Sequence, residues 1–177
     1  MWDKKWLPID IHSVFFYTFA PVQNKNNMDD KCKIYEELLL QAKALAEDES
    51  DSIALMANIA ALLHERMHFW WTGFYRVIGQ ELVLGPFQGP AACTRIQFGR
   101  GVCGTAWQQQ KTLIVPDVEQ FAGHIACSSL SKSEIVVPVF KDQTIVAVLD
   151  IDSEHLNFFD LTDQKYLEKI VNIILCK

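Results

Sequence analysis

Residues 134–152 read Glu-Ile-Val-Val-Pro-Val-Phe-Lys-Asp-Gln-Thr-Ile-Val-Ala-Val-Leu-Asp-Ile-Asp. Two runs rich in valine and isoleucine, 134–140 and 144–152, flank the polar link 141–143. Such runs, joined by a short polar link, predict two antiparallel strands in a hairpin. Pro138 has no backbone N–H to donate to a neighbouring strand, so it indicates an edge strand or a bulge at that point.

Acidic residues cluster at one end of this hairpin. Asp150 and Asp152 are two residues apart, so in a strand they point to the same face. Glu134 opens the partner run and could bring a third carboxyl group near them. Like charges held close together cannot all ionise cheaply, so we expect a raised pKa for at least one acid, which could then serve as a general acid. The spacing alone leaves open that these acids only end the strands in solvent.

The segments around the hairpin predict helices and further strands. Apolar residues recur at three-and-four spacing over 29–47, 53–67 and 162–175, which is typical of amphipathic helices. Ser50 or Ser52 is a candidate cap for the second of these helices. Further strands are expected at 69–77, 81–87, 93–98 and 112–115, with a short helix at 102–110. Strands framed by terminal helices indicate an α+β fold, a central antiparallel sheet with helices packed against it.

Length and composition limit the function classes. The chain has 177 residues, 50% hydrophobic and 21% charged, which suits one globular domain. Its net charge of −6 argues against binding to a nucleic acid backbone. No apolar stretch approaches the length needed to cross a bilayer. We expect residues 1–27 to be a weakly structured extension and residues 28–177 to form a single domain.

The five cysteines form an odd count without any Cys-x-x-Cys pair. This pattern does not fit a secreted disulfide scaffold, so we expect a reducing cytoplasm. Cys93, Cys103 and Cys127 gather on mostly connecting chain, where clustered thiols suggest catalysis, redox sensing or metal binding. Cys32 and Cys176 lie on predicted helices and are interpreted as small hydrophobic residues.

The same stretch contains possible ligands for a zinc site and part of a dinucleotide-binding motif. Cys93, Cys103, His124 and Cys127 could supply four zinc ligands, but only His124 and Cys127 are closely spaced, as ligands of structural zinc sites usually are. A nearby His124 imidazolium would instead lower the pKa of the Cys127 thiol. The glycines at 99, 101 and 104 match part of a dinucleotide-binding motif, without the βαβ unit that it requires.

Several motifs in a fixed order resemble one enzyme family. They occupy residues 71–75, 84–93, 98–106, 115–118, 123–127, 133–138 and 148–153. Together they resemble the free methionine-(R)-sulfoxide reductases, single-domain enzymes of the GAF fold. The resemblance extends over roughly 29–176. One local departure is Gly89-Pro90, where a lysine often intervenes in the family.

The resemblance implies a reaction and a site. The reaction is reduction of free methionine (R)-sulfoxide to methionine, with thioredoxin restoring the enzyme and without a metal or other cofactor, as protection against oxidative stress. The motif positions imply Cys127 as nucleophile, Cys93 as resolving cysteine and Cys103 as a third redox-capable thiol. Implied substrate contacts are Trp71, Tyr75, Glu134, Asp150 and Asp152. A homodimer would be unsurprising for this fold.

An alternative interpretation stays open: a non-catalytic GAF module that senses a small ligand or the redox state. A sensor pocket has no need for Cys93 and Cys127 together, so the cysteines favour the enzyme.

Overall fold

The computed structural model describes residues 28–125 and 129–174. Two cysteines, Cys127 and Cys176, and the predicted extension 1–27 lie outside these described residues. Within the described ranges, no helix is long and apolar enough to span a membrane.

Six strands form one sheet in the order β3-β2-β1-β6-β5-β4, and every neighbouring pair is antiparallel. The strands are β1 (Trp71–Ile78), β2 (Glu81–Gln88), β3 (Arg95–Gln97), β4 (Leu113–Val115), β5 (Ser133–Lys141) and β6 (Thr144–Ser153). The predicted α+β class with a central antiparallel sheet is confirmed.

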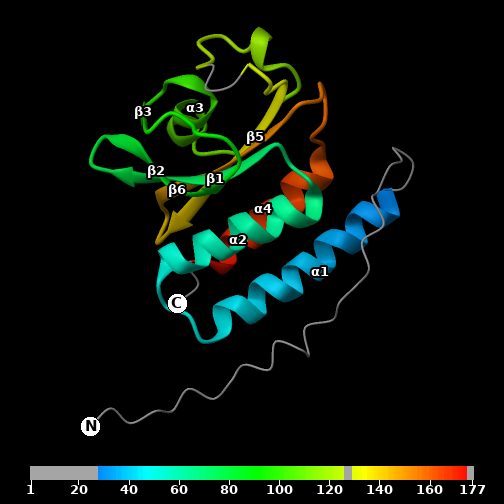
Figure 1. Cartoon of the computed structure of the whole chain (residues 1–177). Coiled ribbons are helices and arrows are strands. Elements are labelled where there is room, and N and C mark those ends of the chain that lie inside the picture. Colours follow the sequence, from blue (N-terminus) through cyan, green and yellow to red (C-terminus); the bar gives the residue numbers. More distant parts are fainter. Residues whose placement is uncertain (1–27, 126–128, 175–177) are drawn as a thin grey trace.

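The helices cover the two faces of the sheet unequally. Helices α1 (Met28–Glu47), α2 (Ser52–Met67) and α4 (Leu161–Ile173) lie on one side, and α3 (Gly101–Gln109) lies on the other (Figure 1). A 3₁₀ turn, Val118–Gln120, follows β4. The three long helices bury the apolar stripes seen in the sequence, including Leu38, Ile59 and Leu167.

Side-chain alternation along β1 separates two cores. Phe74 points to the layer of α1, α2 and α4, where it packs with Ile135 and Leu149. Trp71 and Tyr75 point to the opposite face, towards α3. Adjacent residues of one strand therefore serve different layers, as the period of two predicts.

The hairpin of β5 and β6 forms as predicted. Lys141 pairs with Thr144, so Asp142 and Gln143 form a two-residue turn, and both have positive φ angles, 49° and 64°. Two positive φ angles match the turn type that suits the twist of paired strands. In the described sheet, β4 accompanies β5 only as far as Val136. Pro138 therefore lies where β5 has one paired neighbour, next to a register shift at 139–140.

Two local predictions were wrong. The cap of α2 is Asp51, whose side chain accepts hydrogen bonds from the backbone N–H groups of Ile53 and Ala54 at 2.7 and 3.2 Å, and neither Ser50 nor Ser52. The third strand is shorter than 93–98, because β2 pairs with β3 only from Val83 to Glu81. Cys93 consequently lies in a loop.

A buried carboxylate ties α1 to α4. Asp163 is fully buried and accepts hydrogen bonds from the Tyr35 hydroxyl at 2.7 Å and from Lys31 Nζ at 2.6 Å. It also accepts from the backbone N–H of Asp160 at 2.8 Å, which completes a capping box at the start of α4. This pairing satisfies a charge that would otherwise be costly to bury.

Candidate active site

A cavity of about 40 Å³ lies on the α3 side of the sheet. Strands β1, β5 and β6 form its floor, and α3 and the loops before and after it form its walls. Its described lining residues are Trp70, Trp71, Tyr75, Pro90, Ala91, Ala92, Ile96, Gly101, Cys103, His124, Ile125, Ser131, Glu134, Asp150 and Asp152.

Three carboxyl groups meet in this cavity because of strand register. Glu134 of β5 pairs with Asp152 of β6, and Asp150 lies two residues earlier on the same face. Glu134 and Asp150 are 6% and 7% exposed, and Asp152 is partly exposed. The prediction that the three acids gather on one face is confirmed, and they are not solvated strand ends.

Burial holds protons on these acids. Burial, followed by the nearby charges of Asp150 and Asp152, raises the pKa of Glu134 well above its ordinary value. Burial raises the pKa of Asp150 to about 6, although contacts with Cys103 and Glu134 oppose this rise. Burial and the charge of Asp150 also raise the pKa of Asp152, against a contact with Ser131. The cluster therefore retains at least one proton near neutral pH.

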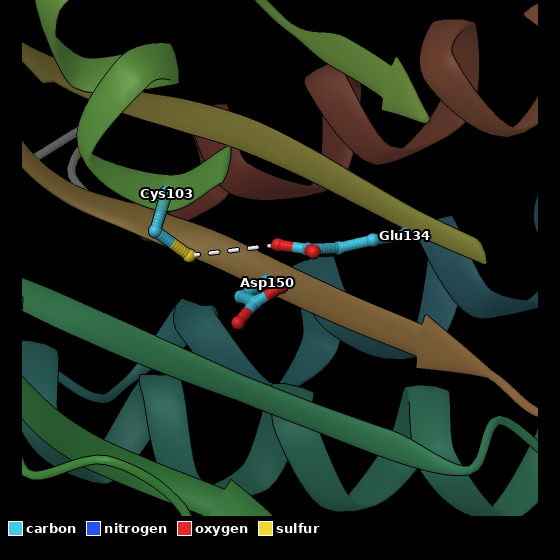
Figure 2. Close-up of side chains that lie close together, drawn as sticks. All are labelled: Cys103, Glu134 and Asp150. Carbon is cyan, nitrogen blue, oxygen red and sulfur yellow. Dashed lines mark hydrogen bonds between the residues drawn. The ribbon is translucent and has the colours of Figure 1, made fainter. Parts of the chain in front are cut away.

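Cys103 approaches the acids from α3. Its thiol is 3% exposed and donates a hydrogen bond to Glu134 Oε1, with Sγ and Oε1 3.9 Å apart. Figure 2 shows the thiol pointing from the helix towards Glu134, with Asp150 beside this pair. Burial, then the charges of Asp150 and Glu134, raises the pKa of Cys103, so the group is a neutral thiol near pH 7.

The same three side chains are also possible metal donors. One atom from each of Cys103, Glu134 and Asp150 lies within 4.8 Å of the others. Of the four zinc ligands that the sequence suggested, Cys103 belongs to this set, and Cys127 lies outside the described residues. Asp150 Oδ1 is buried and has no hydrogen-bond partner in the described part of the chain, so the cavity offers one unused acceptor.

Two aromatic rings of β1 line the floor of the cavity. Trp71 and Tyr75 flank Gly73, and their ring centroids are 6.0 Å apart. A Cβ atom on Gly73 would lie 2.4 Å from the Trp71 ring and 2.5 Å from Phe87 Cβ, so only glycine leaves room for the indole. The prediction that Trp71 and Tyr75 share a face is confirmed.

Of the three cysteines expected in the site, the structure describes Cys93 and Cys103. Cys93 is half-buried and takes part in a disulfide, whereas Cys32 and Cys103 are free thiols. Cys127 itself lies outside the described residues. Burial lowers the pKa of His124 despite the opposite effect of Glu119, which disfavours the imidazolium form that would lower the pKa of a neighbouring thiol.

Sequence reasoning missed Ser131 and Trp70. Ser131 is 7% exposed and contacts Asp152, but it stands in a polar segment, 128–133, where nothing distinguishes it from its neighbours. Trp70 lines the cavity, and its buried Nε1 has no hydrogen-bond partner among the described residues. Its position beside Trp71 was the available signal.

The chain is similar in sequence to known proteins that contain a GAF domain. The family profile of the GAF domain matches residues 49–174. GAF domain-containing protein A of Dictyostelium discoideum is 61% identical over 141 residues, 79% of this chain and 89% of that protein. The free methionine-R-sulfoxide reductase of Escherichia coli is 44% identical over 143 residues, 80% of this chain and 87% of that enzyme.

A solved structure shows the same fold. The free methionine-R-sulfoxide reductase of Neisseria meningitidis, determined in complex with its substrate, has 53% sequence identity and a TM-score of 0.81. The match covers 84% of this chain and 90% of that one. The predicted GAF fold is thereby confirmed.

Proposed function

The chain belongs to the GAF-domain free methionine-R-sulfoxide reductase family, and we propose that it reduces free methionine (R)-sulfoxide to methionine. The observation that carries this proposal is the cavity in which Glu134, Asp150 and Asp152 meet beside aromatic rings and a thiol.

The chemistry requires a nucleophilic thiolate and a proton donor in one place. The thiolate attacks the sulfoxide sulfur, and the sulfoxide oxygen needs a proton as its bond to that sulfur breaks. A buried carboxyl group that keeps its proton near neutral pH supplies it. Glu134 and Asp152, whose pKa values burial raises well above their ordinary values, are the candidates for this role.

We assign the cysteine roles from the family motifs. Cys127 attacks the substrate sulfur, receives the oxygen and becomes a sulfenic acid as methionine leaves. Cys93 then condenses with that sulfenic acid to form a disulfide and water, which protects the nucleophile from further oxidation. Cys103, held as a thiol against Glu134, is a third redox-capable group.

The remaining groups bind the substrate. An ionised carboxylate pairs with the substrate ammonium group through charge-assisted hydrogen bonds, and Asp150 Oδ1 is available for this purpose. The indole of Trp71, beside the ring of Tyr75, contacts the methyl group, which becomes sulfonium-like during attack. A cavity that pairs the charged ends of a free amino acid leaves no room for flanking peptide bonds, so we expect rejection of peptide-bound sulfoxide.

We further propose thioredoxin as the reductant, acting by dithiol exchange on the disulfide. The expected setting is the cytoplasm, where the cycle would protect against oxidative stress, and a homodimer is the expected assembly. To test the reductant, the protein is incubated with methionine (R)-sulfoxide, thioredoxin, thioredoxin reductase and NADPH. Consumption of NADPH that depends on all of these components would support thioredoxin.

The decisive experiment is incubation of the purified full chain with racemic methionine sulfoxide and dithiothreitol, followed by chiral chromatography. We expect the R epimer to disappear and methionine to accumulate while the S epimer remains. Persistence of both epimers would favour the non-catalytic sensing module. Equal turnover of a peptide-bound sulfoxide would contradict the proposed selectivity.

A further inference from the structure

The polar ends of two aromatic side chains of β1 reach the same loop. Residues 89–94 connect β2 to β3 and carry Cys93. Trp71 Nε1 donates a hydrogen bond to the carbonyl oxygen of Pro90 at 3.0 Å. The Tyr75 hydroxyl donates to the carbonyl oxygen of Cys93 at 2.9 Å. One strand of the cavity floor therefore holds this loop at two points.

Tyr75 is itself held rigidly. Its side chain is 1% exposed, and its ring packs beside that of Trp71. Burial, followed by the charges of Asp150 and its neighbours, raises the pKa of Tyr75, so the hydroxyl keeps its proton and continues to donate. A phenol hydroxyl can donate one hydrogen bond, and here the carbonyl oxygen of Cys93 accepts it.

The backbone joins the sheet directly after Cys93. Ordered pairing of β2 with β3 begins only at Arg95, and the backbone N–H of Leu84 reaches the carbonyl of Thr94 at 3.0 Å. The Tyr75 hydroxyl bonds the carbonyl oxygen of Cys93 itself, one residue before this pairing.

We propose that Tyr75 is a positioning residue for Cys93, which fixes the backbone of this cysteine so that its sulfur can reach the oxidised nucleophile. This inference rests on the proposed function. In the step concerned, the Cys93 sulfur attacks the sulfenic sulfur, an S–S bond forms and the S–O bond breaks. The departing hydroxide takes the proton lost by the Cys93 thiol and leaves as water, so no other oxidant or reductant enters.

Disulfide formation depends strongly on placement, because the two cysteine backbones must come within a narrow distance range. Removal of the hydroxyl leaves the ring in the cavity but releases the Cys93 carbonyl. The step that uses Cys93 should then slow more than the step that forms methionine.

The test compares Tyr75→Phe with the natural protein in single-turnover experiments. Reduced enzyme is mixed with methionine (R)-sulfoxide without reductant, and quenched samples are analysed for methionine and, after alkylation, for free Cys93 thiol by mass spectrometry. We expect Cys93 thiol loss to slow about tenfold relative to methionine formation, which is the effect of one lost hydrogen bond. The matched control is Tyr166→Phe, whose hydroxyl meets Glu36 at 3.3 Å in the helix layer, and both rates should be unchanged there.

A second arm does not depend on the substrate. One equivalent of hydrogen peroxide oxidises the nucleophilic thiol directly to a sulfenic acid, and Cys93 thiol loss is then followed as before. Slower loss in Tyr75→Phe supports the inference even if the natural protein makes no methionine, a result that would defeat only the proposed substrate. Equal slowing of both steps, or no change in either arm, would overturn the inference.

Discussion

Glu134 and Asp152 lie directly opposite each other on the neighbouring strands β5 and β6. Opposite residues on one face of an antiparallel pair have Cβ atoms about 4.5–5.5 Å apart, and like charges at that distance destabilise a sheet. Asp150 adds a third acid on the same face, in a cavity with little solvent. A purely structural role would favour apolar residues here, so the cost in stability supports the proposed chemical role of the cluster.

Replacement of Asp150 by asparagine should stabilise the protein more as the pH rises. The folded state raises the pKa of Asp150 from 3.8 to about 6, so it holds this proton better than the unfolded chain does. Protonated Asp150 therefore contributes its full stabilisation at a pH below its unfolded pKa of 3.8. This contribution is lost as the pH rises through its folded pKa of about 6. We expect the melting temperature of Asp150→Asn, relative to the natural protein, to increase between pH 4 and pH 7.

The control with the opposite sign is Asp160→Asn. Burial opposes ionisation of Asp160, but the hydrogen bond and charge of Lys31 outweigh it and lower its pKa. This carboxylate contributes stability above its unfolded pKa and loses it as the pH falls, so the variant should become relatively less stable as the pH rises through about 4. Parallel pH curves for the two variants would show that neither proton is bound as described.

Cys127→Ser should form no methionine even in a single cycle, because a serine hydroxyl is a poor nucleophile towards sulfoxide sulfur. Cys93→Ser should release about one methionine per enzyme and then stall. Quenched-flow chromatography measures both yields. Cys32→Ser, which replaces a free thiol of the helix layer, should behave as the natural protein does. Methionine production by Cys127→Ser would remove Cys127 from the role of nucleophile.

The Cys103 thiol should react slowly with alkylating agents. It is 3% exposed, and burial and the neighbouring acids raise its pKa, so little thiolate exists at pH 7. We expect iodoacetamide to label Cys103 in the reduced protein at least tenfold more slowly than the partly exposed Cys32, as followed by peptide mass spectrometry. Asp150→Asn removes the larger of these charges and should accelerate labelling. Similar rates at Cys103 and Cys32 would contradict the burial of this thiol.

Asp163→Asn should lower the free energy of unfolding by about 2–4 kcal/mol, because it leaves the partly buried Lys31 without its closest counter-charge and weakens the bond to Tyr35. Urea unfolding of the full chain measures this value. The matched control is Asp30→Asn, whose exposed pair with Lys33 at 3.9 Å should contribute less than about 0.5 kcal/mol. Equal effects of the two substitutions would mean that α1 and α4 are not joined at Asp163.

Local patterns were sufficient for most of the fold. The β5–β6 hairpin, its turn and the shared face of Asp150 and Asp152 follow from residue spacing, because side chains alternate strictly along a strand. The third strand was predicted to begin at residue 93, but it begins at Arg95. The apolar residues near Cys93 that suggested a strand lie instead in a loop that packs on the cavity. The cap of α2 was misassigned because Ser50, Asp51 and Ser52 all have capping side chains, and only the geometry selects one.

Residue patterns were enough to predict the class of the fold, the order of helices and strands, the shared face of Asp150 and Asp152 and, through the motifs, the family. Packing of the elements was needed to show that the Cys103 thiol donates to Glu134, that burial lowers the pKa of His124 and that the Tyr75 hydroxyl donates to the backbone of Cys93. The physical reason is distance along the chain. Periodicity reports which face a residue occupies, whereas burial, pKa and contacts between residues 18 or 31 positions apart arise only when separate elements pack together.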